Sequence, residues 1–313
     1  MITLKRYSKI DKPAWDQFVR SSKNGIFLFC RDYMDYHEDR FTDHSIIFEK
    51  KNKIVAVLPA NENGKELISH AGLTFGGLVM HYDLWMSEVL EIFDLLYHYC
   101  ADKGFNAIIY KVIPSVFHKY PSEEDLYALF RYEAKLIKRD ISSVLSQSHK
   151  IRFSEGKRQA VEKCKRNDAL RLAEATDFTE YWELLTAVLS KFQAKPVHSL
   201  EEIHHLKNHF PQQIKLYELR SDTKLLAGIV IYDYDGLVHT QYMANSQEGR
   251  TLGALDYLND FLINEVYRDR NHYSWGISTE QGGRVLNTGL IQQKEGMGGR
   301  GVALDLYKID IKI

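Results

Sequence analysis

The chain has 313 residues, of which 41 are Lys or Arg and 42 are Asp or Glu, so its formal net charge is −1. This balance argues against a protein-wide basic field that would bind DNA. No apolar run approaches the roughly 18 residues of a membrane helix, and the N-terminal residues lack the apolar core of a signal peptide. At about 150 residues per domain, we expect a cytoplasmic two-domain protein without a membrane span.

The three cysteines are odd in number and far apart in the sequence. Their spacing argues against a disulfide framework and against a zinc cluster. The chain also has no GxSxG, GxxxxGK[ST] or CxxC motif. Serine hydrolases, P-loop NTPases and thiol redox enzymes are therefore not the first expectation.

The first half of the chain predicts antiparallel strands, then a helix and another strand. Residues 45–80 contain strand-like runs with a turn at Asn63-Gly64, where glycine tolerates the positive φ of a hairpin. Residues 87–104 are helix-like, and residues 105–113 form an apolar strand-like run.

The middle of the chain predicts one strand and three helices. The strand is expected over residues 134–145. Ser199 and Glu202 have the spacing of a capping box, so a helix should begin there. The three helices are expected at 154–166, which is basic, 177–192 and 199–210.

The second half repeats the order of the first. Residues 214–250 contain strand-like runs with a turn at Asp235-Gly236, followed by an amphipathic helix from Leu252 to Val266 and a strand over 272–279. We predict two copies of one unit, with domains at 1–150 and 151–313. The fold class is α+β, and each domain is a mixed, mostly antiparallel sheet flanked by helices.

A glycine-dense segment near the C-terminus is the first candidate site. Eight glycines occur between Gly276 and Gly301, and such density lets a backbone approach a ligand. Polar groups suited to proton transfer or carboxylate binding share the segment. We predict substrate contacts there from Ser278, Asn287, Lys294 and Glu295, and proton transfer by Glu280.

A second candidate site follows the Asp235-Gly236 turn. His239, Gln241 and Met243 are predicted to alternate along one strand face, with Thr240 and Tyr242 on the other. The glycines and arginine that follow could form a phosphate site at a helix N-terminus. The alternative is an ordinary capped helix with a solvated arginine.

Three other regions carry chemistry-bearing residues. His205 and His209 share a helix face at a metal-like spacing, but no third ligand is evident, so we expect no metal. The basic helix is either a solvated face or a surface for a phosphorylated donor, tRNA or lipid-linked acceptor. In the loop 69–77, the side chains of His70, Thr74 and Phe75 are predicted to shape an acceptor pocket; otherwise its glycines serve folding alone.

From about Phe27 to its C-terminus the chain resembles the FemABX-like branch of the GNAT acyltransferase superfamily. The resemblance is carried in order by FLFCRDYMDYHEDRFTDHSIIFEKKNKIVAVLPAN, SHAGLTFGG, KPVHSLEEI, HTQYMANSQEGRTLGALDYL and WGISTEQGGRVLNTGLIQQKEGMG. It implies two tandem GNAT domains, the first degenerate and on the acceptor side, the second with the donor loop and active cleft. Such proteins join an acyl or aminoacyl group to an amine, often on a cell-wall or surface-polysaccharide precursor.

The resemblance also implies a donor site. GNAT enzymes bind the donor pyrophosphate on a [Q/R]-x-x-G-x-[G/A] loop; here Arg250 and Gly253 match it, while Leu255 replaces the last small residue. No tightly bound cofactor is expected, and acyl-CoA would be a co-substrate. Fem-type members use aminoacyl-tRNA instead, which the basic helix would suit. The residues predicted to bind the donor are Ala244, Gly249, Arg250, Gly253 and Ala254.

As an N-acyltransferase, the protein must remove a proton from the acceptor amine and stabilise an oxyanion. The candidate bases are Glu280 and His239, and Tyr242 is a candidate acid for the leaving group. Backbone N–H groups near Tyr242–Ala244 could bind the oxyanion, Gln241 is a further substrate contact, and Lys294 or Arg250 could anchor a phosphate or carboxylate. The partner would be a small-molecule or lipid-linked amine. A binding protein that has lost turnover is the alternative from another class.

Overall fold

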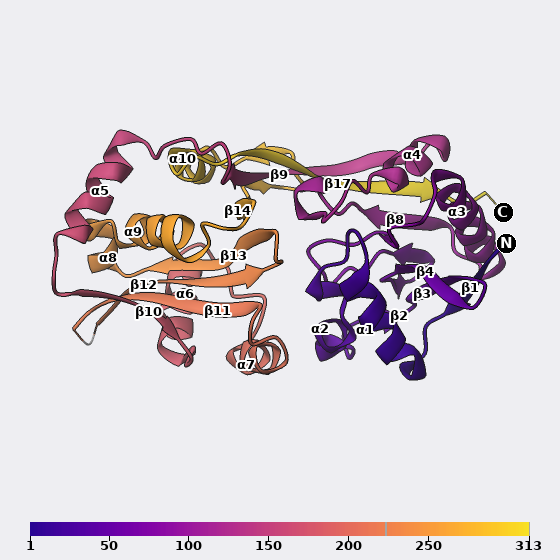
Figure 1. Ribbon diagram of the computed structural model, residues 1–313, viewed down its shortest axis with the longest axis horizontal. Coiled ribbons are helices and arrows are strands. Elements are labelled where there is room, and N and C mark those ends of the chain that lie inside the picture. The colour runs from indigo at the N-terminus through magenta and orange to yellow at the C-terminus, as the bar shows by residue number, and fades with distance from the viewer. Residues whose placement is uncertain (223, 313) are drawn as a thin grey trace. The chain divides into compact units, whose positions relative to one another are not determined.

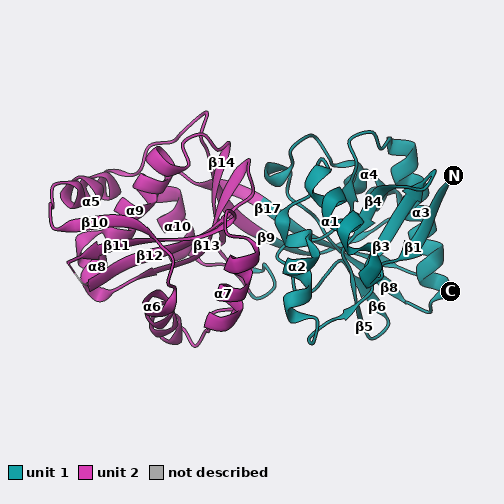
Figure 2. Cartoon of the chain, turned by 60° about the horizontal axis from the view of Figure 1, so that its bottom comes forward, with its two compact units in different colours: residues 1–140, 281–284, 303–313 teal, residues 141–280, 285–302 magenta. Residues whose placement is uncertain are grey.

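The computed structural model describes residues 1–222 and 224–312. The chain divides into two compact units (Figures 1 and 2). Unit 1 comprises residues 1–140, 281–284 and 303–313, and unit 2 comprises residues 141–280 and 285–302. The sequence placed the division between residues 150 and 151. The observed units divide differently because two long strands, β9 (Lys135–Ser146) and β17 (Arg300–Asp310), each begin in one unit and end in the other.

Unit 1 contains two groups of strands. The first is an antiparallel sheet in the order β1-β3-β4-β7, and the second has the order β17-β8-β6-β5-β2, in which only β6 and β8 are parallel. The strands are β1 (Ile2–Arg6), β2 (Thr42–Asp43), β3 (Ile46–Lys50), β4 (Lys53–Leu58), β5 (Asn61–Asn63), β6 (Glu66–Ile68), β7 (Val79–Met80) and β8 (Ala107–Lys111).

The helices of unit 1 are α1 (Lys12–Ser21), α2 (Arg31–Met34), α3 (Met86–Asp102) and α4 (Glu124–Arg131). The apolar face of α3 lies in one core with strand residues such as Phe48 and Tyr110, which are fully buried. The predicted helix 87–104 and strand 105–113 are therefore confirmed as α3 and β8. The predicted Asn63-Gly64 turn is confirmed as well, since Asn63 pairs with Glu66 across the β5–β6 hairpin.

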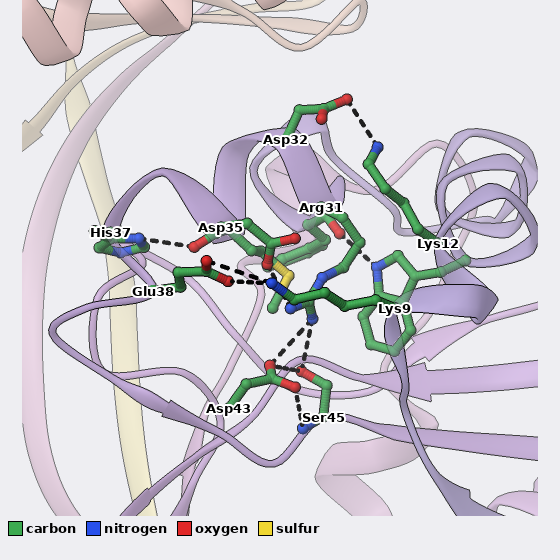
Figure 3. A network of polar contacts seen from close by, with 12 residues as sticks. Lys9, Lys12, Arg31, Asp32, Asp35, His37, Glu38, Asp43 and Ser45 are labelled. Atoms are coloured by element: carbon green, nitrogen blue, oxygen red, sulfur yellow. Dashed lines mark hydrogen bonds and ion pairs between the residues drawn. The ribbon is translucent and has the colours of Figure 1, made fainter.

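A buried arginine ties α2 to the strands of unit 1 (Figure 3). The guanidinium of Arg31 donates to Asp43 Oδ1 and to Ser45 Oγ, both at 3.1 Å, and forms an ion pair with Asp35. Its Cζ lies 4.0 Å from the centroid of the Tyr7 ring. Since Arg31 is only 4% exposed, these contacts compensate the desolvation of its charge.

The sheet of unit 2 has the order β10-β11-β12-β13-β14-β9, antiparallel throughout except for the parallel pair β13–β14. Its strands are β10 (Leu170–Ala175), β11 (Ile214–Ser221), β12 (Lys224–Asp233), β13 (Leu237–Asn245) and β14 (His272–Ile277), and a separate small hairpin is formed by β15 (Thr279–Glu280) and β16 (Val285–Leu286).

Helices cover both faces of this sheet (Figure 1). Ile229 and Ile231 of β12 pack with the apolar residues of α9 (Ala254–Phe261). On the opposite face, Gly228 of β12 lies close to the Tyr181 ring of α6 (Thr179–Ser190). A Cβ at this position would come within 2.3 Å of that ring. The other helices are α5 (Glu155–Lys165), α7 (Leu200–His209), α8 (Gln247–Leu252) and α10 (Thr288–Gly296).

Most predicted elements of unit 2 are confirmed. Residues 134–145 form β9, and the helices α5, α6 and α7 occur where expected. The capping box is present, because Glu202 N–H donates to Ser199 Oγ and Ser199 N–H donates to the Glu202 carboxylate. The single helix expected from Leu252 to Val266 is wrong: Gly253 separates α8 from α9, and residues 262–266 form a π-helical turn.

The predicted order of elements recurs in both units. In unit 1, α3 leads into β8, which is parallel to β6; in unit 2, α9 leads into β14, which is parallel to β13. The α+β class with mixed, mostly antiparallel sheets flanked by helices is confirmed. Within the described residues, every helix is too short or too polar to cross a bilayer.

Candidate functional site

Unit 2 contains a cavity of about 760 Å³ beside the C-terminal end of β13. Its size is that of a small-molecule site. Most of its wall is apolar, and one arginine, one glutamate, one glutamine and two asparagines supply the polar groups. It is lined by Val188, Leu189, Phe192, Met243, Asn245, Arg250, Leu255, Glu280, Asn287, Gly289, Leu290 and Gln293.

A β-bulge shapes β13 next to this cavity. Thr240 pairs with Ile231 and Tyr242 pairs with Val230, so Gln241 is an extra residue without a partner on β12. The predicted strict alternation is therefore wrong. Because paired residues share a face, Thr240 and Met243 lie on the α9 face, whereas Tyr242 lies on the opposite face.

The pairing of β13 with β14 also ends early. The parallel register runs only from Leu237–His272 to His239–Ser274, although both strands continue, to Asn245 and Ile277. The two strands therefore separate beyond His239, and Met243 and Asn245 of β13, which lie past this point, line the cavity. Tyr242–Ala244, whose backbone N–H groups were predicted to bind the oxyanion, lie in this unpaired part of the β13 edge.

The glycine-dense segment is anchored by a buried lysine. Lys294, 3% exposed, donates from Nζ to the carbonyl oxygens of Gly276 at 3.0 Å and Ile277 at 2.6 Å. Burial lowers the pKa of Lys294 to about 8. The N–H of Ser278 donates to Ile141 O at 2.8 Å, and the buried Ser278 Oγ has no hydrogen-bond partner among the described residues. Lys294 and Ser278 thus position this segment and do not line the cavity.

Glu280 lies at the end of the anchored segment and faces the cavity. Asn287 Nδ2 donates to its carboxylate at 2.7 Å, while Asn287 Oδ1 caps α10 by accepting from Leu290 N–H at 3.0 Å. The cap fixes the asparagine, and the asparagine fixes the carboxylate. A carboxylate held in this way is suited to accept a proton from a bound amine.

The other two predicted catalytic side chains are occupied elsewhere. His239 Nδ1 lies 3.1 Å from Ser274 Oγ, and burial, together with the charge of Lys294, lowers the pKa of His239 to about 4. The Tyr242 hydroxyl lies 2.6 Å from His198 Nδ1, and its ring packs against Trp182. Neither belongs to the described residues that line the cavity, so Glu280 is the base candidate that the geometry favours.

The predicted donor loop is a short helix. Arg250 lines the cavity from α8, but the N–H of Gly249 donates to Ser246 Oγ and that of Gly253 to Arg250 O. A Cβ on Gly249 would lie 2.2 Å from Leu226 O, and Gly253 has a φ of +79° and packs on Ala160. These glycines serve close packing and the break between two helices. Of the predicted donor residues, Arg250 alone lines the cavity; Ala244 and Ala254 are buried.

The predicted acceptor residues are dispersed. His70 and Phe75 are buried inside unit 1, where His70 packs near His37 and Phe75 packs on Phe117, and Thr74 is exposed. Burial lowers the pKa of His70 to about 3. In unit 2, Gln241 lies at the bulge and Glu295 is exposed on α10.

Two of the lysines of the basic helix α5 form ion pairs with the neighbouring helix α9. Lys157 pairs with Asp256 at 2.5 Å and Lys165 with Asp260 at 3.0 Å, which holds α5 against α9. Lys163 and Arg166 are exposed and form no ion pair with a described residue. The histidines His205 and His209 lie one turn apart on α7, and no group of three or more metal-ligating side chains occurs among the described residues.

Sequence reasoning missed the apolar wall of the cavity. Val188 and Leu189 lie at the C-terminal end of α6, and Phe192 follows two residues after it. Their spacing is that of an ordinary amphipathic helix, and nothing in it marks a ligand-facing end. Asn245 was also missed. Its buried Oδ1 has no hydrogen-bond partner among the described residues, so it can accept a hydrogen bond from a ligand N–H.

No family model matches the chain, and neither does any curated protein. Solved structures do match. FemX aligns over 97% of this chain and 96% of its own, with a TM-score of 0.69 at 10% identity. L-PGS from Bacillus licheniformis aligns over 97% and 92% with a TM-score of 0.59 at 13% identity. A tandem GNAT protein from the clavulanic acid biosynthesis pathway aligns over 100% and 99% with a TM-score of 0.53 at 8% identity.

The chain has a tandem GNAT-like fold. At these identities the likeness concerns the fold, and it agrees with the resemblance to FemABX-like proteins. It covers both units, because nearly the whole of this chain aligns with nearly the whole of FemX and of the tandem GNAT protein.

Proposed function

We propose that the protein is an N-acyltransferase that moves an acyl group from acyl-CoA to an amine, and that the cavity in unit 2 holds the donor. The observation that carries this proposal is the combination of an apolar wall with a fixed carboxylate and an arginine in one cavity. The apolar wall suits an acyl chain and its pantetheine arm, and Arg250 can pair with a phosphate. Asn245 Oδ1 can accept from a pantetheine amide.

The reaction follows from these positions. The acceptor amine attacks the thioester carbonyl carbon, the C–N bond forms as the C–S bond breaks, and CoA leaves as the thiol. Glu280 accepts the proton that the amine loses. Backbone N–H groups of β13 beyond His239, where the ladder with β14 ends, can donate to the developing oxyanion. The cysteines are buried in both units and take no part.

The acceptor class is proposed as an amino sugar or an amino acid of a cell-surface polysaccharide or cell-wall precursor, either free or lipid-linked. The support is the fold shared with FemX, together with the resemblance of the sequence to FemABX-like proteins. We further propose that the protein works in the cytoplasm, where acyl-CoA is available.

A second donor is favoured by one observation. Lys163 and Arg166 on α5 are exposed cations without ion-pair partners among the described residues, and such a surface can contact the phosphates of an aminoacyl-tRNA. In that case the same cavity would hold the aminoacyl end. A tandem GNAT-like binding protein without turnover is the third alternative, and it predicts tight binding with no product.

The donor is tested by titrating the protein calorimetrically with acetyl-CoA, longer acyl-CoAs and free CoA. We expect saturable binding that tightens with acyl length and weakens about tenfold in Arg250→Ala, since a lost charge-assisted bond to phosphate costs roughly 1.5–3 kcal/mol. Arg268→Ala removes an exposed arginine outside the cavity and is the matched control.

Absence of saturable binding by every thioester would exclude acyl-CoA as the donor. The tRNA alternative then predicts that Lys163→Glu with Arg166→Glu abolishes binding of aminoacyl-tRNA. Lys165 is left intact in that variant because it pairs with Asp260 and holds α5 to α9.

A further inference from the structure

A second cavity, of about 590 Å³, lies wholly within unit 1. Its walls come from β1, from His44 before β3, from the β5–β6 hairpin, and from Tyr99 of α3 with the residues that follow this helix. The predicted acceptor residues His70, Thr74 and Phe75 are not among the described residues that line it. The transfer chemistry proposed above therefore leaves this cavity unexplained.

The charge of this cavity is strongly one-sided, although the whole chain has a net charge of −1. Its only carboxylate is Glu62, against the four basic side chains Lys5, Arg6, Lys65 and Lys103. Lys5 and Arg6 already form ion pairs. Lys65 and Lys103 are exposed and form no ion pair with any described residue. Two ammonium groups in one concave site favour an anionic ligand.

A buried polar relay forms another part of the wall. His44, 3% exposed, lies with Nδ1 2.7 Å from Glu62 Oε1 and with Nε2 2.7 Å from the Tyr99 hydroxyl. Burial lowers the pKa of His44 and thereby favours the neutral ring, which carries one N–H.

The relay determines the direction of the hydrogen bond between Tyr99 and His44. Since the Glu62 carboxylate can only accept, the His44 proton lies on Nδ1 and Nε2 must accept from the Tyr99 hydroxyl. The Tyr99 oxygen then has its lone pairs left for the cavity, which it lines. It can accept a hydrogen bond from a hydroxyl or amine of the ligand.

We propose that this cavity binds a small phosphate-bearing molecule, with its phosphate between Lys65 and Lys103 and a hydroxyl or amine donor at the Tyr99 oxygen. The volume fits a small molecule, and lysine binds phosphate as a point charge. The proposal is independent of the transfer reaction, because none of its residues belongs to unit 2.

The test is calorimetric titration of the full chain with inorganic phosphate, pyrophosphate and glucose 1-phosphate at constant ionic strength. We expect saturable binding that weakens about tenfold or more in Lys65→Gln with Lys103→Gln. The matched control is Lys51→Gln with Lys53→Gln, which removes two exposed lysines of the β3–β4 hairpin that lie outside this cavity.

Two further variants separate the contacts. Tyr99→Phe should weaken glucose 1-phosphate, which has hydroxyl donors, and leave pyrophosphate unchanged. Glu280→Gln should bind all three probes as the wild type does, so that a failed transfer assay and a failed phosphate site are told apart. Circular dichroism checks that each variant is folded.

Three outcomes would overturn the proposal. They are no saturable binding of any probe, unchanged affinity in the Lys65/Lys103 variant, and equal weakening in the control pair, which would indicate the overall charge alone. A fourth arm uses phosphatidylcholine vesicles with and without phosphatidylglycerol. Vesicle binding that needs Lys65 and Lys103, without binding of soluble phosphates, would replace the small molecule with a lipid surface.

Discussion

Lys111 in unit 1 is half-buried and Lys294 in unit 2 is buried, and the ammonium groups of both donate to backbone carbonyl oxygens of a loop. Lys111 Nζ bonds to the oxygens of His70 at 2.9 Å, Ala71 at 3.1 Å and Leu73 at 2.5 Å. Lys294 Nζ bonds to those of Gly276 and Ile277. Burial lowers the pKa of each lysine to about 8. Both loops are rich in glycine and both were predicted to contact substrate.

The two loops differ in where they lead. The loop held by Lys111 leads back into the core of unit 1, where the Phe75 ring packs at a tilt against Phe117 with a centroid distance of 4.4 Å. The segment held by Lys294 continues to Glu280, which lines the cavity of unit 2. The same anchoring device therefore closes a core in one unit and positions a proton acceptor in the other. Glycine density alone does not distinguish these uses.

Of the variants that test the difference between the two loops, Glu280→Gln has the largest expected effect, a loss of turnover. Loss of a general base typically lowers turnover by about 10²–10⁴-fold, and the amide keeps the shape and the contact with Asn287. We expect kcat for acyl transfer to fall by that factor while thermal unfolding stays unchanged, since Glu280 is exposed.

The matched control is Glu265→Gln, an exposed glutamate of unit 2 outside the cavity. Its kcat should equal that of the wild type. Full turnover in Glu280→Gln would show that the base is another group, and His239 would then be the next candidate.

Lys111→Met tests the role of the loop 69–77, which Lys111 holds against unit 1. Methionine keeps the apolar length of the side chain but leaves the three carbonyl oxygens without their donor, so we expect unfolding in urea to require about 2–3 kcal/mol less free energy. Because His70 and Phe75 are packed inside unit 1, kcat of the folded variant should not change. Lys53→Met, at an exposed lysine of the same unit, is the control. A higher KM for the acceptor in Lys111→Met would instead support the predicted acceptor role of this loop.

Lys294→Met makes the same change in unit 2, with two carbonyl oxygens affected. We expect about 1–2 kcal/mol less stability. Since the segment that presents Glu280 loses its anchor, kcat should also fall, on the order of tenfold, as positioning is lost. Lys195→Met replaces an exposed lysine of the same unit and should change neither quantity. If Lys294→Met lost stability at unchanged kcat, the lysine would have no part in placing Glu280.

The sequence was sufficient for features that depend on local pattern. The Asn63-Gly64 turn, the cap of Ser199 and most helices follow from spacing and residue type. Arg250, Glu280 and Asn287 were predicted as site residues because they are polar and lie beside glycines. The structure places all three in the lining of one cavity.

Features that depend on long-range pairing could not be predicted. The bulge at Gln241 has no residue signature. The predicted alternation put Met243 on the face of His239 and Tyr242 on the face of Thr240. The bulge reverses this, so that Tyr242 shares a face with His239 and Met243 shares a face with Thr240. Likewise, the end of α6 reads as a normal apolar stripe, and only its packing near β13 leaves Phe192 facing a cavity. The roles of Gly249 and Gly253 were also decided by neighbours distant in sequence, Leu226 and Ala160.

The smallest expected effect is a pH dependence that Lys111 and Lys294 share. Each has a pKa of about 8 in the folded protein, against 10.5 for an ordinary lysine. Between these values the unfolded chain binds more protons than the folded one, so the free energy of unfolding must rise with pH. For Lys111 the rise from pH 8 to about 9.5 is on the order of 1 kcal/mol. Lys111→Met lacks this titration, so the stability difference between wild type and variant should be flat below pH 7 and should grow in favour of the wild type above pH 8. If the stability difference stayed constant across this range, the Lys111 ammonium group would be hydrated in the folded protein. The contact between Lys111 and the loop 69–77 would then be accessible to water.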